Sequence, residues 1–368
     1  MVLPSSLATW ADVDHPQVAA RIAPWNAAAS ADAAASLGAN PRSPRVRALV
    51  RRALARDLTQ VTAIELRALD LAVSGKQAQA RRLFQLSDRL SRRSLPTRLW
   101  LIQDAVDRGD VASALHDFDI ALRTSTDAQP ILFPVLARAS ADPRLAIPLA
   151  RTFDRPSEWR LMFFEWVLSN GVDARPIASI VARMRDRPFV VANALDQRLV
   201  ERLVTAREFA AARSLSRAFG HNSTGVADPN FGDANAHFPF GWELVSNGSI
   251  GAERAVSGSS SVLSYSAEPA KGGQVASQLL GLAPGAYVLA TKAAANATGA
   301  APYWSLACDG GGGEIARLDQ PMTANGRVQV QFSVPPGCVA QWLTLTIRPA
   351  PDSNTQSGAI AWIRVSPR

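Results

Sequence analysis

The 368-residue chain has little cysteine, little histidine and only three lysines. Its two cysteines, Cys308 and Cys338, cannot form a structural zinc site without histidine ligands, and no histidine follows His237. The four histidines are isolated along the chain, and none has a nucleophile or an acid at the spacing of a catalytic motif. We therefore predict no catalytic residue, no metal site and no cofactor, and we expect a protein that is not an enzyme.

The sequence also has no run of 18 or more apolar residues, so we expect no transmembrane segment. The first residues lack a basic stretch followed by an apolar core, and no secretory leader is expected in this chain. Cys308 and Cys338 leave two states open. They could form a disulfide, which requires an oxidising compartment, or remain as two reduced thiols.

The net charge of +8 belongs to the N-terminal part of the chain. Residues 1–224 contain 31 Lys and Arg against 22 Asp and Glu, whereas residues 225–368 contain eight against nine. A basic surface can attract nucleic acid, anionic lipid or an acidic polymer. Here nearly all the basic residues are arginine, interleaved with acidic residues in an alanine-rich sequence, which is typical of compositional bias. We expect no nucleic-acid partner.

What the sequence does contain is a recurrence of 34 residues. Glycine, alanine and phenylalanine recur at matching offsets, as Gly75, Ala80 and Phe84 and then as Gly109, Ala114 and Phe118. Helical periodicity extends from about residue 5 to 219, with the clearest helices at 43–56, 62–74, 77–91, 98–108 and 111–123. Each glycine suits the positive φ at a helix end. A helix pair of this length must stack on its copies to bury its apolar face.

The second-helix patterns Ala80–Phe84–Ser87 and Ala114–Phe118–Ala121 resemble tetratricopeptide repeats. The resemblance is close over residues 15–126 and weak over 127–220, where prolines interrupt the period. It implies an α-solenoid that binds a protein partner. The lysine with which chaperone-binding members clamp a carboxylate is replaced at Ala31, Glu65 and Leu99. The predicted partner contacts lie on the concave first helices, at Glu65, Leu69, Gln103 and Asp107.

From residue 238 onward, short alternating segments separated by turn residues predict an antiparallel jelly-roll β-sandwich. Strands are expected at 242–245, 262–265, 275–280, 287–291, 304–308, 328–334, 342–348 and 359–365. The predicted architecture is multidomain α plus β. It has a tetratricopeptide-like α-solenoid over 1–220, regular to about 126 and degenerate after, then a linker over 221–237 and the sandwich over 238–368.

Three motifs of this part resemble carbohydrate-binding modules of the galactose-binding-like jelly-roll superfamily. They are Phe240-Gly241-Trp242, the segment from Gln278 to Tyr287, and the segment from Trp304 to Cys308. The resemblance implies that the sandwich binds a glycan.

Strand alternation places some aromatic and amide side chains on the outer faces of the sandwich. The carbohydrate-binding candidates are Trp342, Trp362, Tyr303, Gln329 and Gln331. A sugar ring can pack its CH face on an exposed indole while amide groups bond its hydroxyls. The alternative is that these tryptophans are structural and lie under a loop or against the helical domain.

Taken together, these patterns favour a non-catalytic bacterial adaptor that holds a protein partner through its helices and a polysaccharide through its sandwich. Such a protein would act in the assembly or export of an extracellular polysaccharide, in the periplasm or cell envelope, although a cytoplasmic location stays open. Two alternatives remain. One is a purely protein–protein scaffold with a structural sandwich, and the other is an accessory subunit of a polysaccharide-modifying enzyme.

Overall fold

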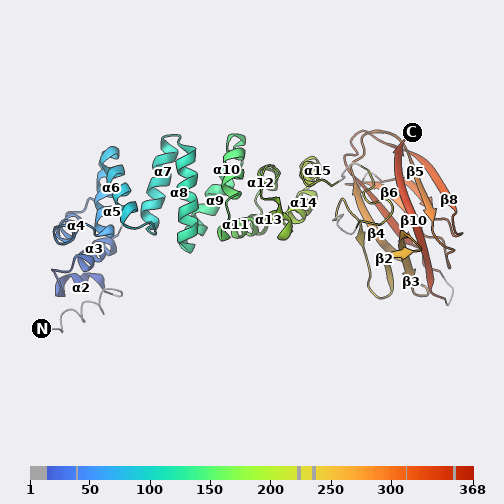
Figure 1. Ribbon diagram of the computed structural model, residues 1–368, viewed down its shortest axis with the longest axis horizontal. Helices are drawn as coiled ribbons and strands as arrows, with labels where there is room; N and C mark the ends of the chain where they lie inside the picture. The colour runs from blue at the N-terminus through green and yellow to red at the C-terminus, as the bar shows by residue number, and fades with distance from the viewer. Residues whose placement is uncertain (1–14, 39, 222–224, 234–237, 312, 351–353) are drawn as a thin grey trace. The chain divides into compact units, whose positions relative to one another are not determined.

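The computed structural model describes residues 15–38, 40–221, 225–233, 238–311, 313–350 and 354–368. The chain is α plus β, with helices in its first part and two antiparallel five-stranded sheets in its last (Figure 1). It folds as two compact units, Met1–Trp166 and Val167–Arg368. This division falls before the predicted linker, because the last helices share a unit with the strands.

The first unit is built of helices that are joined by short turns. These are α2 (Pro16–Ile22), α3 (Ala27–Ser36), α4 (Pro44–Arg56), α5 (Val61–Val73), α6 (Gln77–Leu90), α7 (Leu95–Asp107), α8 (Val111–Thr124), η1 (Thr126–Ala128), α9 (Gln129–Ser140), η2 (Pro143–Leu145), α10 (Ala146–Phe153) and the start of α11 (Glu158–Ser169). Consecutive helices pack as the pairs α3–α4, α5–α6 and α7–α8. The five clearest predicted helices are therefore confirmed as α4 to α8.

Glycine ends the first helix of two of these pairs. Gly75 and Gly109 have φ of +77° and +71°, a conformation that glycine adopts without steric cost. After α5, the amide of Lys76 donates to the carbonyl of Leu71 at 2.9 Å, and after α7 the amide of Asp110 donates to Ala105 at 2.8 Å. This six-to-one bond is the Schellman closure of a helix, so the recurring glycine fixes the turn between paired helices.

Among the described residues, the second unit holds the remaining helices and the strands. The helices are α12 (Ala174–Val181), α13 (Arg187–Ala192), α14 (Leu195–Thr205) and α15 (Phe209–Ala218). The strands are β1 (Glu243–Leu244), β2 (Ile250–Ser257), β3 (Ser260–Ala267), β4 (Gly273–Leu280), β5 (Gly285–Ala293), β6 (Tyr303–Cys308), β7 (Glu314–Asp319), β8 (Arg327–Val334), β9 (Gln341–Ile347) and β10 (Gln356–Pro367).

The strands form two sheets with the orders β1-β4-β9-β6-β7 and β2-β3-β10-β5-β8. One apolar core lies between them, with Leu263 and Ile363 from one sheet and Trp304, Leu306 and Leu343 from the other. The antiparallel sandwich and eight of its strands were predicted. Strands β2 and β7 were missed because each is a sheet edge with charged residues, which weakens the apolar alternation that marks a strand.

Part of the predicted linker belongs to the sandwich. Phe231 is 1% exposed and packs on Trp242 at 5.4 Å between ring centroids. The amide group of Gln278 exchanges two hydrogen bonds with the backbone of Ala227, at 2.9 and 3.0 Å. The segment that includes Val226 therefore runs along the sandwich and forms one wall of the groove described next. His237 lies outside the described residues.

Candidate functional site

The outer face of the sheet β2-β3-β10-β5-β8 carries three rows of side chains across neighbouring strands. The first row is Trp362 of β10, Lys292 of β5 and Arg327 of β8; the second is Arg364, Ala290 and Gln329; the third is Ser366, Val288 and Gln331. These positions face outward because the alternate residues, such as Leu289 and Ile363, are fully buried in the core.

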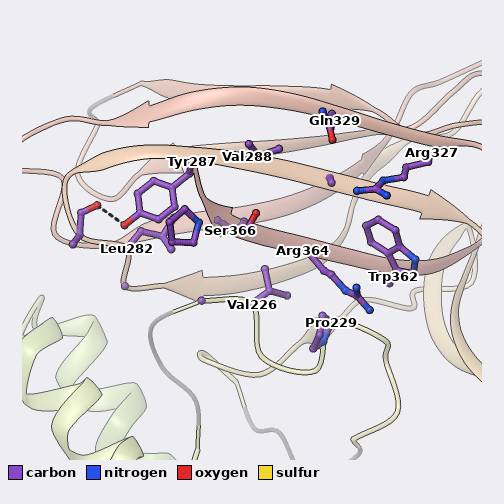
Figure 2. A pocket seen from close by; sticks show the side chains of 16 residues that line it. Val226, Pro229, Leu282, Tyr287, Val288, Arg327, Gln329, Trp362, Arg364 and Ser366 are labelled. Carbon is purple, nitrogen blue, oxygen red and sulfur yellow. Dashed lines mark hydrogen bonds between the residues drawn. The ribbon is translucent and has the colours of Figure 1, made fainter.

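Seven of these nine residues form the floor of a groove of about 900 Å³, whereas Lys292 and Gln331 lie outside its lining. Its walls come from the segments around Val226 and Pro229 and around Leu282, with Tyr287 near one end (Figure 2). The hydroxyl of Tyr287 donates to the carbonyl of Ala283 at 3.0 Å, which fixes that ring. Apolar floor positions alternate with long polar side chains, so the groove presents both apolar surface and hydrogen-bonding groups to a ligand.

Two guanidinium groups lie against the ring of Trp362. The Cζ atom of Arg364 is 4.8 Å and that of Arg327 is 5.3 Å from the ring centroid, and Figure 2 shows both side chains beside the indole. Cation–π attraction holds such groups against the ring. The half-buried indole therefore lines the groove together with two guanidinium groups, and not as an isolated aromatic ring.

The charge of the groove is positive. Among the described residues that line it, Arg327 and Arg364 are the only charged ones. Arg364 donates from Nη2 to the Oδ1 atom of Asn230 at 3.2 Å, which is a neutral acceptor. Both arginines are exposed. The groove can thus offer unneutralised guanidinium groups to a ligand.

Trp342 lies on the other sheet, in β9. Its Nε1 atom donates to Oδ1 of Asp309 at 3.1 Å, and its ring stacks on Phe238 at 6.0 Å. A hollow beside it is bordered by Glu201 and Val204 of α14. Trp342 is half-buried and lies on a different sheet from Trp362, so the two tryptophans do not form one site.

Tyr303 lies on the same sheet as Trp342, in β6. Arg317 and Arg348 lie over its ring, with Cζ atoms at 4.4 and 4.7 Å from the centroid. Unlike the groove arginines, these two are paired with carboxylates, Glu314 at 2.9 Å and Asp319 at 2.6 Å. Of the five predicted glycan-binding residues, the groove brings together Trp362 and Gln329, with Gln331 one row further along β8.

Glu65, predicted as a partner contact, is buried in the first unit with 7% exposure. Its Oε1 atom accepts hydrogen bonds from Thr97 Oγ1 at 2.7 Å, from Ser87 Oγ at 3.0 Å and from Ser94 Oγ. That prediction is wrong for Glu65, because the carboxylate joins α5 to α6 and to the start of α7 instead of facing a partner.

The other three predicted partner contacts differ in exposure. Leu69 is half-buried and packs against the cluster around Ala68 and Phe84. Gln103 and Asp107 are exposed, and the Nε2 atom of Gln103 donates to Oδ1 of Asp107 at 2.7 Å. These two remain accessible on the surface of α7.

Two inter-helix ion pairs repeat with the 34-residue period, and the sequence reasoning missed them. Arg47 of α4 pairs with Asp70 of α5, and Arg81 of α6 pairs with Asp104 of α7, with two bonds of 2.7 Å in the second pair. Hydrogen bonds from these arginines, more than the opposing effect of burial, hold the pKa of Asp70 and of Asp104 below the ordinary range. The matched arginine and aspartate spacing was visible in the sequence.

Other aspartates of the helices are also structural rather than solvated. The carboxylate of Asp119 is buried and accepts from Nε1 of Trp159 at 2.9 Å. Asp117 and Asp88 pair with Arg98, whose side chain is 2% exposed. Burial raises the pKa of Asp117 although Arg98 opposes that rise.

A disulfide joins Cys308, at the end of β6, to Cys338, in the turn between β8 and β9. No group of three or more His, Cys, Asp or Glu that could hold a metal ion occurs in the described part of the chain. None of the described helices is long and apolar enough to cross a membrane.

Comparisons with known proteins give weak similarities. No protein-family model matches the chain, and a search of curated proteins finds no match. Solved structures of carbohydrate-binding modules match the β-rich C-terminal region. One, titled "CBM4 structure and function", shares 14% identity at a TM-score of 0.29 and covers 39% of this chain and 99% of its own.

Two further structures match over a similar part. TmCBM61 in complex with β-1,4-galactotriose shares 12% identity at a TM-score of 0.27, over 40% of this chain and 100% of that one. The CBM22-1 xylan-binding domain from Paenibacillus barcinonensis shares 16% identity at a TM-score of 0.26, over 39% and 96%. Likeness at this level carries no argument about function, so the proposals below rest on the residues of this chain.

Proposed function

We propose that this protein is a non-catalytic adaptor whose sandwich binds a glycan in the groove around Trp362 and whose helices hold a protein partner. Its proposed role is in the assembly or export of an extracellular polysaccharide. The observation that carries the proposal is the groove itself, about 900 Å³ of open space on an outer sheet face lined by an aromatic ring, an amide and two guanidinium groups.

The chemistry of the groove suits a hydroxyl-rich polymer. The side chain of Gln329 is exposed in the groove, and an amide both donates and accepts hydrogen bonds, as a sugar hydroxyl does. Val288 and Ala290 supply apolar floor between the polar side chains. An open groove on a sheet face accepts an extended chain without requiring a chain end.

Partner binding by the helices has separate support in the first unit. A groove of about 740 Å³ between α4 and α5 is lined by Leu54, Leu66 and Leu58, the last with 77% exposure. Most of the residues that line this groove are apolar, and a contiguous exposed apolar patch is typical of a surface that another chain covers. Gln103 and Asp107 remain the further proposed contacts.

The proposed location is the periplasm or cell envelope. The disulfide between Cys308 and Cys338 supports it, since disulfides persist in oxidising compartments. Titration of thiols in protein taken from its native host tests the location, with no free thiol expected before reduction.

Binding of the full chain to a panel of immobilised neutral and acidic polysaccharides tests the function. We expect retention on at least one polymer, weakened about tenfold or more by Trp362→Ala, because that substitution removes the ring that holds both arginines. Trp342→Ala is the matched control, since Trp342 lies outside the groove, and its binding should stay within about twofold of the parent.

Thermal unfolding confirms that each variant is folded before its binding is compared. If the folded parent protein binds no polysaccharide, the glycan-binding function is wrong, and the search moves to protein partners of both units.

A further inference from the structure

We propose that the groove around Trp362 recognises carboxylate groups, and that its ligand is an acidic polysaccharide of the polyuronate class. The inference rests on the proposed glycan binding and names the class of glycan. It follows from how the side chains of this groove are charged and arranged.

Two guanidinium groups lie against the ring of Trp362. Arg327 and Arg364 approach the ring from the two strands that flank β5, with Cζ atoms at 5.3 and 4.8 Å from the centroid. Stacking on an aromatic face restrains a guanidinium and leaves its planar N–H edge able to form two parallel hydrogen bonds to a carboxylate. In the strand register Lys292 lies between Trp362 and Arg327, and it adds a third cation to the same sheet face.

The two sheets of the sandwich differ in whether their stacked arginines are neutralised. Tyr303 on the opposite sheet also has two arginines over its ring, but Arg317 pairs with Glu314 and Arg348 with Asp319. Among the described residues, Arg327 and Arg364 form no ion pair with any carboxylate. The same local arrangement is thus neutralised on one sheet and left open to an anion on the other.

Positive charge in the C-terminal part of the chain gathers on one sheet. Half of the eight basic residues after position 224 are on or directly after β5, β8 and β10, namely Lys292, Arg327, Arg364 and Arg368. The whole segment nevertheless carries nine acidic residues against those eight. A nearly neutral module with one cationic face suits a polymer with spaced carboxylates, whereas nucleic acid carries one charge for about every 1.7 Å and is bound by broadly basic surfaces.

The experiment compares two forms of one polymer. The full chain is titrated by biolayer interferometry against immobilised polygalacturonate, alginate and hyaluronate, and against methyl-esterified polygalacturonate, in which the backbone is kept and the charge is removed. We expect the protein to bind at least one acidic polymer, and we expect this binding to weaken as the NaCl concentration rises. Binding to methyl-esterified polygalacturonate should be at least tenfold weaker than binding to polygalacturonate.

Charge-removing variants locate the interaction. Arg327→Gln and Arg364→Gln should each weaken binding about tenfold, the usual effect of losing one charge-assisted hydrogen bond, and the double variant more. Arg317→Gln is the matched control, because it removes an arginine stacked on an aromatic ring whose charge is already neutralised. Its binding should stay within about twofold.

The outcomes separate this inference from the function on which it rests. Equal binding of the ester and the acid, or binding of neutral polymers alone, overturns the carboxylate inference and leaves glycan binding standing. Binding of duplex DNA or of anionic lipid vesicles with no binding of any acidic polysaccharide overturns it in favour of another polyanion. If folded protein binds none of the polymers, both proposals fail.

Discussion

At the scale of single residues, alternation along a strand predicted the facing of side chains well, except where the backbone departs from regular geometry. In β9, Leu343, Leu345 and Ile347 are buried, as alternation from the outward Trp342 requires, while Trp342 is only half-buried. In β10, regular alternation from the outward Trp362 would also place Ile360 outward, but Ile360 is fully buried. A β-bulge between Ile360 and Trp362 adds one residue and shifts the alternation, which strand periodicity alone cannot reveal.

Glu65 gives the prediction at this scale. Glu65→Ala should lower the free energy of unfolding by about 2 kcal/mol, because three hydroxyl groups lose their shared acceptor in a buried position. Glu65→Gln keeps an acceptor oxygen and should cost less. Urea unfolding followed by circular dichroism measures both variants.

Gln103→Ala is the control for Glu65, since Gln103 is exposed on the neighbouring first helix and should change stability by less than about 0.5 kcal/mol. A Glu65→Ala variant that is as stable as the parent protein, but binds a partner less well, would restore Glu65 as a binding residue.

At the scale of elements, the 34-residue period predicted where helices begin and end better than it predicted what joins them. The glycine turns after α5 and α7 follow from local sequence. The pairing of Arg47 with Asp70, and of Arg81 with Asp104, crosses from one helix pair to the next. An aspartate considered by itself on a helix is usually solvated. Only the equal spacing of each aspartate from an arginine indicates that the two residues join one helix pair to the next.

These ion pairs predict the response of the helices to acid. The pKa of Asp104 is lowered in the folded state. The ionised carboxylate therefore stabilises the fold at pH values above the pKa of an ordinary aspartate, about 3.9. That contribution is lost as the pH falls through the lowered pKa. Asp104→Asn should therefore destabilise the protein at pH 7, and its stability should fall less than that of the parent between pH 5 and pH 2.

Chemical unfolding across that pH range measures the difference. Asp142→Asn is the control, because Asp142 pairs locally with Arg144, whose side chain is 89% exposed, and such a surface pair adds little stability. Parallel loss of stability with pH in the parent and in Asp104→Asn would show that the Asp104 pair does not stabilise the folded helices.

At the scale of the whole molecule, the switch from helical to strand periodicity near residue 220 predicted a domain boundary there. That division remains a proposal, since the second compact unit already begins at Val167. Within this unit, Arg207 pairs with Asp309 at 3.0 Å, and Arg213 donates from Nη1 to the carbonyl of Val339 at 2.8 Å. Helices α14 and α15 are thereby tied to the sandwich at the side where Trp342 lies.

We predict that the sandwich depends on these helices. A fragment of residues 226–368 should unfold at a lower temperature than a fragment of residues 171–368, because it loses the Arg207–Asp309 pair and the cover beside Trp342. The fluorescence of Trp342 is obtained in each fragment by comparison with the Trp342→Phe variant. Acrylamide should quench this fluorescence more strongly in the shorter fragment. Equal melting temperature and equal quenching would show instead an independent sandwich with an exposed Trp342.

The sequence by itself determined the element types, most of their boundaries and the outward position of Trp362 and Gln329. Helix and strand periods, glycine turns and alternation are local, so they can be read within a few residues. Only the tertiary structure decided which residues share a site. It separated Trp342 from Trp362 onto two sheets, buried Glu65, and brought Arg327 and Arg364 onto one ring from strands whose pairing depends on distant segments.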